Sequence, residues 1–80
     1  MIRQYLIDLR KKKGLKQEAV ALCAGYSRNA INSFERGKYD PKVETLIAIA
    51  ICLGVDLGLI CCFEVEYLSN RKKMLDGVKR

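Results

Sequence analysis

Apolar residues recur at the spacing of an α-helix near the start of the 80-residue chain. Between residues 2 and 13 they fall three or four positions apart, as on one face of a helix; these positions are Ile2, Tyr5, Leu6 and Leu9. Residues 17–24 form a second short apolar stretch. Gly14 and Gly25 directly follow the two stretches, and glycine commonly ends a helix because it adopts the left-handed conformation without strain. The pattern predicts helices over 2–13 and 17–24.

A third helix is predicted over residues 28–35. Ser27 precedes it, where a hydroxyl can accept a free backbone N–H of the first turn, and Gly37 follows it. The apolar residues of this helix are Ala30, Ile31 and Phe34. The outward side is polar and carries no acidic residue; it consists of Arg28, Asn29, Asn32 and Ser33. Since Asn and Ser are mediocre helix formers, helix stability does not explain their choice.

A fourth helix is predicted over residues 43–53, after Pro41. No polar residue occurs between positions 46 and 53, and a helix that is apolar on every side is buried on every side. The core of so short a chain can cover only one face of it. We therefore expect a contact with a second subunit, made by Ile47, Ile51 and Cys52.

The segment 59–68, LICCFEVEYL, has a different pattern. From residue 62 onward apolar and acidic residues alternate; the apolar ones are Phe63, Val65 and Tyr67, and the acidic ones are Glu64 and Glu66. Alternation with β-branched and aromatic residues favours a strand, although the spacing of Val65, Leu68 and Leu75 also tolerates a helix. A lone strand leaves backbone groups unpaired, so we expect it to pair with its twin in a second subunit through Phe63, Val65 and Tyr67.

The predicted organisation is one domain over residues 1–60, a dimerisation strand over 59–68 and a frayed basic tail over 69–80. Ten Lys and Arg residues stand against four Asp and Glu in residues 1–42, a net charge of +6. Residues 43–70 carry −4 and residues 71–80 carry +4. A basic first half suggests a polyanionic partner, although a basic surface also keeps a small protein in solution.

Composition removes several chemistries. The chain has no His, which excludes imidazole catalysis and Cys₂His₂ zinc sites. The four cysteines include no Cys-x-x-Cys pair and have apolar neighbours, so we expect buried free thiols rather than metal ligands or disulfides; they are Cys23, Cys52, Cys61 and Cys62. We expect no metal and no cofactor. With no signal sequence and no long apolar run, we expect a cytoplasmic protein that does not interact with membranes.

Two short helices joined by a tight turn, the second with a polar outward face, have the anatomy of a helix-turn-helix. Over about residues 2–60 the chain resembles the Cro/C1-type repressor family, also called the XRE family. The residues in register with that family are Leu9, Arg10, Gly14, Gln17, Gly25, Ser27, Ile31, Glu35, Arg36, Gly37, Pro41, Leu46, Ala50, Leu53, Gly54 and Val55.

The resemblance implies an all-α, five-helix lambda-repressor-like domain whose third helix enters the major groove of double-stranded DNA. The implied base-reading residues are Arg28, Asn29, Asn32 and Ser33. The implied phosphate contacts are Gln17, Arg36, Lys38, Tyr39 and Lys42. We also expect phosphate contacts from Ser27 and from Lys16, which departs from the family by replacing its usual Ser or Thr cap and adds a cation near the phosphates. The family also implies a structural ion pair between Arg10 and Glu35. Two departures bear on the end of the domain, because Gly58 stands where a fifth helix would form and the strand-like segment extends beyond the usual domain.

The favoured function is a homodimeric, sequence-specific transcriptional regulator, more a repressor than an activator, which reads a near-palindromic operator. An alternative of another class is an antitoxin that binds a toxin partner and represses its own operon, and a third is a restriction–modification controller. The sequence does not distinguish between these. An enzyme is not expected, because the chain has no His, no paired acids with a plausible cleft and no phosphate-binding glycine loop.

Overall fold

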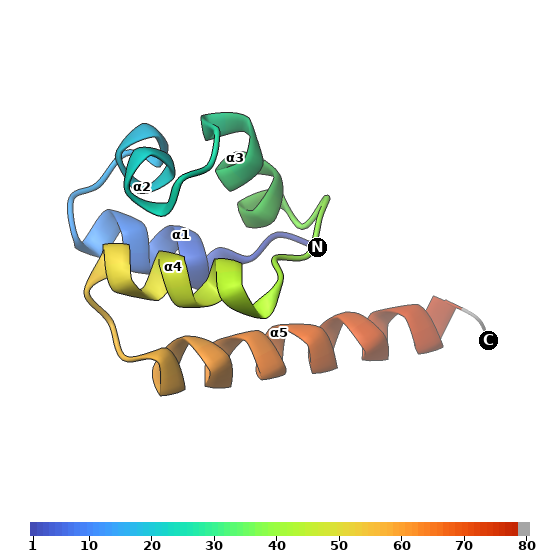
Figure 1. Ribbon diagram of the computed structural model, residues 1–80. Helices are drawn as coiled ribbons and strands as arrows, with labels where there is room; N and C mark the ends of the chain where they lie inside the picture. Colours follow the sequence, from blue (N-terminus) through green and yellow to red (C-terminus); the bar gives the residue numbers. More distant parts are fainter. Residues whose placement is uncertain (79–80) are drawn as a thin grey trace.

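The computed structural model describes residues 1–78 and contains five helices. They are α1 (Gln4–Lys12), α2 (Gln17–Ala24), α3 (Arg28–Arg36), α4 (Val43–Leu53) and α5 (Leu57–Val78). Helices α2 and α3 lie on one side of the molecule, α5 lies on the opposite side, and α1 and α4 lie between them (Figure 1). The expected all-α, five-helix architecture is confirmed.

One hydrophobic core joins the five helices. Each contributes a residue that is almost completely buried; these are Leu6, Val20, Ile31, Ile49 and Ile60. Helix α2 packs on both α3 and α4, and α4 packs on α5. The core therefore holds α2 and α3 as a pair whose outer side remains free of packing.

Helix α3 ends at Gly37, which also accommodates a close approach of the chain. Gly37 has φ 77°, a left-handed conformation that strains other residues. A Cβ atom at this position would overlap the carbonyl oxygen of Met1. The first residues of the chain thus pass directly under the end of α3, where the Tyr67 hydroxyl donates a hydrogen bond to the same carbonyl.

The predicted strand over 59–68 is wrong, because this segment is the first half of helix α5 and the described residues contain no strand. The buried positions are Ile60, Glu64 and Tyr67, which are four and three residues apart, as on one helical face. Glu64 points inward, although its charge suggested an outward position in an alternating pattern. The Asp56 carboxylate accepts a hydrogen bond from the Gly58 N–H (3.4 Å), so Gly58 lies in the first turn and does not prevent the helix.

The expected tail is also wrong over most of its length, since α5 continues to Val78 and extends past the rest of the molecule (Figure 1). Residues 79–80 of that tail lie outside the described residues.

No described helix has both the length and the apolar character needed to cross a membrane.

Two of the residues expected at a dimer interface make aromatic or buried contacts within the monomer. The Phe63 ring stacks on the Tyr5 ring with centroids 5.5 Å apart, and Tyr67 is only 5% exposed. By contrast, Ile47, Ile51 and Val65 are exposed, Ile51 to 73%. These three residues are available to a second subunit, whereas Tyr67 is buried, Phe63 is half-buried against Tyr5, and the thiol expected at Cys52 is instead bonded to Cys23.

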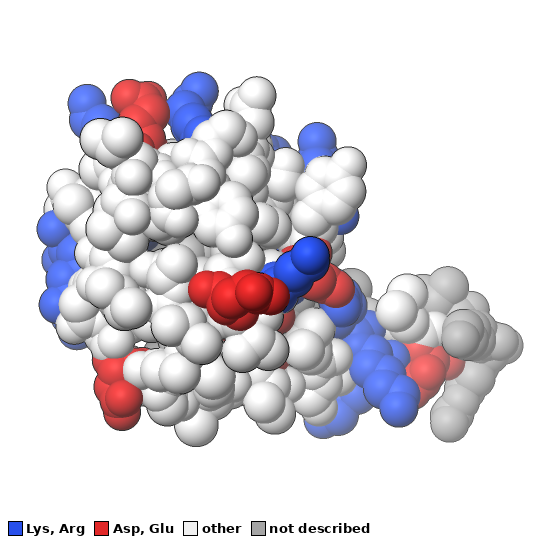
Figure 2. Space-filling view, viewed as in Figure 1, with Lys and Arg blue, Asp and Glu red and all other residues white. Residues whose placement is uncertain are grey.

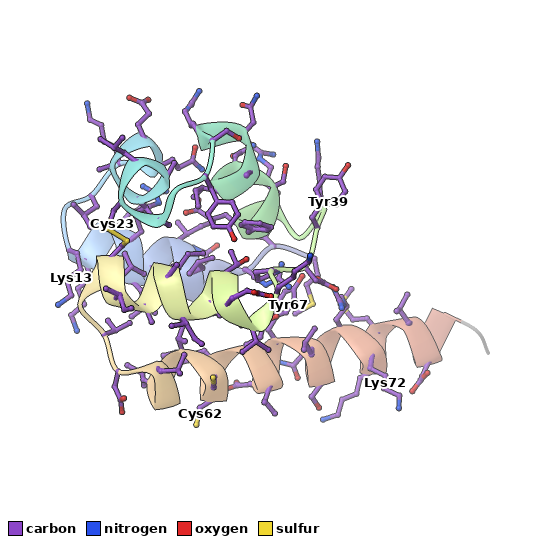
Figure 3. The ribbon with its side chains drawn as sticks, viewed as in Figure 1. Lys13, Cys23, Tyr39, Cys62, Tyr67 and Lys72 are labelled. Atoms are coloured by element: carbon purple, nitrogen blue, oxygen red, sulfur yellow. A yellow bond between two sulfur atoms is a disulfide. The ribbon has the colours of Figure 1, made fainter. Side chains whose placement is uncertain are left out.

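The expectation of four buried free thiols is wrong as well. Cys23 at the end of α2 and Cys52 at the end of α4 form a disulfide, with Cα atoms 5.9 Å apart (Figure 3). Cys61 and Cys62 are free but exposed on α5. The sequence offered no signal for the pairing, because 29 positions separate the two cysteines and only the packing of α2 on α4 brings them together.

Reduction of the Cys23–Cys52 disulfide is expected to lower the free energy of unfolding by about 3–4 kcal/mol. A cross-link across 29 positions restricts the unfolded chain, and cutting it restores that conformational entropy. Thermal unfolding followed by circular dichroism, with and without dithiothreitol, measures the difference. A Cys23→Ser variant should not respond to the reductant, whereas a variant with Ser at both 61 and 62 should respond as the wild type does. An unchanged wild-type melting temperature contradicts the expectation.

Candidate nucleic-acid interface

The turn between α2 and α3 is short and held by hydrogen bonds at both ends. Gly25 ends α2 in the left-handed conformation, and the Tyr26 N–H donates to the Ala21 carbonyl at 2.9 Å. The Ser27 hydroxyl accepts from the Ala30 N–H at 3.1 Å, which caps α3 as the sequence predicted. These bonds fix the direction in which α3 leaves α2.

The side chain of Tyr26 anchors the turn to the rest of the domain. Its hydroxyl forms a hydrogen bond of 2.7 Å with the Thr45 hydroxyl on α4. Its ring meets the Phe34 ring edge to face, with centroids 6.0 Å apart, an arrangement that aromatic pairs favour. The turn is therefore braced against both α3 and α4.

The outward side of α3 carries the four residues predicted to read bases. Arg28 and Asn29 are exposed, while Asn32 and Ser33 are half-buried at the margin of the same side. Ile31 lies on the opposite side of the helix, inside the core. The structure thus brings the four polar residues together on a surface that no other described element covers.

Arg28 has an acidic neighbour on α2. Its Nε atom lies 3.5 Å from a Glu18 carboxylate oxygen, and both side chains are largely exposed. An exposed ion pair is worth about 1 kcal/mol or less. Arg28 can therefore leave Glu18 for a stronger partner at little cost in free energy.

A buried carboxylate, that of Glu35, joins three helices beneath this surface. Glu35 is 2% exposed. The Arg10 guanidinium donates to both of its oxygens, at 2.7 and 3.2 Å, and also to the Leu15 carbonyl at 2.9 Å. The implied ion pair between Arg10 and Glu35 is present, and it fixes α3 relative to α1.

Gln17, predicted to contact phosphate, has a structural task in this state. Its side-chain amide donates to the Asn32 oxygen at 3.1 Å and to a Glu35 oxygen at 2.8 Å. This links the first turn of α2 to α3 and holds the Asn32 amide in one orientation, with its NH₂ group left for another acceptor. The phosphate role of Gln17 stays a prediction.

The other predicted phosphate contacts lie at the start of α2, at the turn before α3, and at the end of α3 and in the loop that follows it. Lys16 is exposed at the start of α2, and the remaining cationic and aromatic ones are exposed around the loop 37–42; they are Arg36, Lys38, Tyr39 and Lys42. Ser27 is exposed at the turn, with its hydroxyl engaged in capping α3. Lys and Arg side chains project from the edge of the molecule formed by α2 and α3, with acidic atoms among them (Figure 2).

Sequence reasoning missed the residue with the most polar contacts, Arg3. Its side chain is completely buried beside Glu64 of α5 and Asp40 of the loop 37–42. Hydrogen bonds from Arg71 and Arg3 hold the pKa of the Asp40 carboxyl well below its usual range. The available signal was Glu64, an acidic residue between Ile60 and Tyr67 on an otherwise apolar helical face, which needs a cation as its partner. The strand interpretation concealed this face.

Residues 6–60 match the helix-turn-helix family. The chain belongs to this family of DNA-binding domains, in its Cro/C1 type, as the sequence resemblance implied. Among the described residues no group of His, Cys, Asp or Glu side chains is arranged to hold a metal ion.

Several relatives are themselves phage proteins. The chain is 39% identical over 63 residues to the ImmF control region 10 kDa protein of Bacillus phage phi105, covering 79% of this chain and 70% of that protein. It is 30% identical over 82 residues to the cryptic phage CTXphi transcriptional repressor RstR of Vibrio cholerae, covering 98% and 74%. The crystal structure of the restriction-modification controller protein C.AhdI from Aeromonas hydrophila superposes with a TM-score of 0.70 at 29% identity, covering 72% of this chain and 88% of that one.

Replacing Glu35 with Ala is expected to lower the free energy of unfolding by about 3–5 kcal/mol, because it leaves the Arg10 charge without its buried partner. Urea unfolding measures the loss. Glu18→Ala removes the carboxylate of an exposed ion pair and serves as the control, with an expected loss below about 1 kcal/mol. Equal free energies of unfolding for the two variants would show that the buried Arg10–Glu35 pair stabilises the fold no more than the exposed Arg28–Glu18 pair.

Proposed function

We propose that this protein is a sequence-specific DNA-binding transcriptional regulator, and specifically a repressor. The observation that carries the proposal is the polar, acid-free outward side of α3, held in a fixed direction by the Ser27 cap, the Tyr26 anchor and the Glu35 network. A helix presented in this way can enter the major groove of DNA. The repressor relatives support the same conclusion.

The side chains on α3 suit the edges of base pairs. Arg28 can donate two hydrogen bonds to O6 and N7 of guanine, and Asn29 or Asn32 can pair with N6 and N7 of adenine. Each well-formed bidentate pair is worth about 1–3 kcal/mol of discrimination against the wrong base. Ser33 lies at the margin of the same surface, where its hydroxyl can bond to a base edge or a phosphate. Specificity in this proposal comes from α3.

Affinity comes from the cations around α3. Lys16 at the start of α2 and Lys38 and Lys42 in the loop 37–42 are exposed, and their charges can neutralise phosphates and release counterions. Such contacts position the domain but do not distinguish sequences. We therefore assign the loop 37–42 and the start of α2 to the DNA backbone.

We further propose that the regulator is a homodimer. Ile47 and Ile51 lie four residues apart on α4 and are exposed, as is Val65 on α5, and α4 packs against α5. Exposed apolar residues on two adjoining helices suit contact with a second copy of the chain. In a two-fold dimer the α3 helices would read half-sites about 34 Å apart in a near-palindromic operator.

One observation favours a second candidate function. A crystal structure with a similar fold, that of C.AhdI, belongs to a restriction-modification controller. A controller of this kind would use the same α3 surface, so the two functions share one mechanism of DNA recognition and differ in the genes under control. The gene beside this one distinguishes them, because a controller lies next to a restriction enzyme gene.

Selection of bound sequences from a random DNA pool is expected to yield a near-palindromic motif, and Arg28→Ala is expected to relax the preference at one position in each half-site. The loss of a bidentate contact reduces discrimination there by about 1–3 kcal/mol. Lys38→Ala is the matched comparison, because it removes a cation that contacts phosphate. It should weaken binding to operator and scrambled DNA alike and reduce the salt dependence by about one unit of slope for each subunit. Equal affinity of the wild type for operator and scrambled DNA would overturn the proposed function.

Ile51→Glu is expected to dissociate the dimer and to weaken operator binding at least about tenfold, because a carboxylate replaces an apolar side chain at the contact with the second copy. Ile51 is 73% exposed in the monomer, so the fold should persist. Sedimentation velocity measures the oligomeric state. Leu22→Glu makes the same change at another exposed apolar position, on α2, and should leave self-association unchanged. A wild type that sediments as a monomer at all concentrations contradicts the dimer.

A further inference from the structure

The guanidinium of Arg3 binds the loop 37–42 on one side. One Nη atom donates to the carbonyls of Phe34 (2.8 Å) and Tyr39 (3.2 Å), and the other donates to an Asp40 carboxylate oxygen at 2.7 Å. The side chain of Arg3 is completely buried. The end of α3 and the loop that follows it are therefore attached to one side chain from the start of the chain.

On its other side the same guanidinium binds α5. Its Nε and Nη atoms donate to the two Glu64 carboxylate oxygens at 2.9 and 3.0 Å. The Tyr67 ring lies 4.4 Å from the guanidinium carbon, within the range of a cation–π contact. All five N–H donors of Arg3 are thus used, and the loop and α5 are held at a fixed separation.

Arg71 adds a second connection between α5 and the loop. Its two Nη atoms donate to the two Asp40 carboxylate oxygens at 2.8 and 3.0 Å. Asp40 therefore receives hydrogen bonds from both arginines, and they keep its carboxyl ionised far below neutral pH. The two guanidinium groups also offset a negative charge that would otherwise repel DNA phosphates near Lys38 and Lys42.

The loop itself has few bonds that could hold it in place. Apart from the bonds to Arg3 and Arg71, its described hydrogen bonds lie at its two ends. The N–H groups of Lys38 and Tyr39 share the Ser33 carbonyl at 2.9 and 3.5 Å, the Gly37 N–H donates to the Phe34 carbonyl at 3.2 Å, and the Lys42 carbonyl accepts from the Leu46 N–H at 3.0 Å. Figure 3 shows Tyr39 on this loop and Tyr67 below it, toward α5. The position of the loop is thus set mainly by side chains from outside it.

We propose that Arg3 and Arg71 are positioning residues for DNA binding, which fasten the loop 37–42 to α5 so that its cations meet the DNA backbone. The inference rests on the proposed function, because it assigns this loop to phosphates. It adds that α5, which lies on the side of the molecule away from α3 (Figure 1), controls the strength of DNA binding. Neither arginine contacts DNA in this proposal.

Arg71→Gln, compared with Lys72→Gln, tests the proposal. The two changes remove the same charge at adjacent positions of α5, but only Arg71 contacts Asp40. Lys72 is exposed and points away from the loop (Figure 3). We expect Arg71→Gln to weaken binding to the selected operator about 3- to 10-fold, the effect of losing a charge-assisted contact. Lys72→Gln should change it by less than about twofold.

Hydrogen exchange in the absence of DNA gives a second readout. The amides of Lys38 and Tyr39 should exchange faster in Arg71→Gln and at the wild-type rate in Lys72→Gln, because only the first change loosens the loop. Equal effects of the two changes on binding would show that charge alone is responsible and would overturn the proposal. A wild type that binds no DNA defeats the proposed function, whereas a wild type and an Arg71→Gln variant that bind alike defeat only the positioning role.

Arg3→Lys tests the buried arginine, since it keeps the charge and removes the planar group that binds on two sides. Binding is measured at a temperature where circular dichroism shows the variant to be folded. We expect weaker operator binding and a shallower salt dependence than in the wild type, because the loop cations no longer reach their phosphates. A folded Arg3→Lys variant with wild-type affinity and slope overturns the role of Arg3. If this variant does not fold, the comparison of Arg71 with Lys72 decides.

Discussion

A guanidinium removed from water must find acceptors for all of its N–H groups within the protein, and Arg3 imposes this constraint on three separate parts of the chain. Its acceptors come from the end of α3, from the loop 37–42 and from α5. None of these segments can move alone without leaving a buried charge or a buried donor unpaired. No buried polar side-chain atom among the described residues lacks a partner, so the constraint is met completely in this arrangement.

Sequence reasoning succeeded where the structure depends on local interactions and failed where it depends on contacts between residues far apart in the chain. Helices α1 to α4 were predicted because their periodicity, their glycine ends and the Ser27 cap are local signals, and the family resemblance supplied the Arg10–Glu35 pair. The conformation of residues 59–68 was not predicted, because Glu64 in this segment pairs with Arg3, which lies 61 positions away. Glu64 points inward only because Arg3 is there to meet it, and a rule that places charges outward therefore turned a helical face into an apparent strand. The Cys23–Cys52 disulfide was missed for the same reason, because its two residues are 29 positions apart and meet only in the folded structure.

Two buried carboxylates, those of Glu35 and Glu64, hold different parts of α3 and of the loop that follows it. Glu35 lies beneath the helix and ties it to α1 and α2 through Arg10 and Gln17, so it fixes the direction of the surface proposed to read bases. Glu64 acts from α5 through Arg3 and reaches only the end of α3 and the loop beyond. The orientation of the outward side of α3 and the placement of the loop 37–42 thus depend on separate ion pairs.

The disulfide encloses α3, proposed to recognise DNA, in a covalent ring. The covalent ring closed by Cys23 and Cys52 contains the turn, all of α3 and the loop 37–42, while Arg3 and α5 lie outside it. A single backbone cut anywhere between the two cysteines, for example in the exposed loop, would leave one covalently connected molecule. The residues proposed to read bases and the loop proposed to contact phosphates are therefore protected against separation into fragments, whereas Lys16 and Gln17 lie outside the ring.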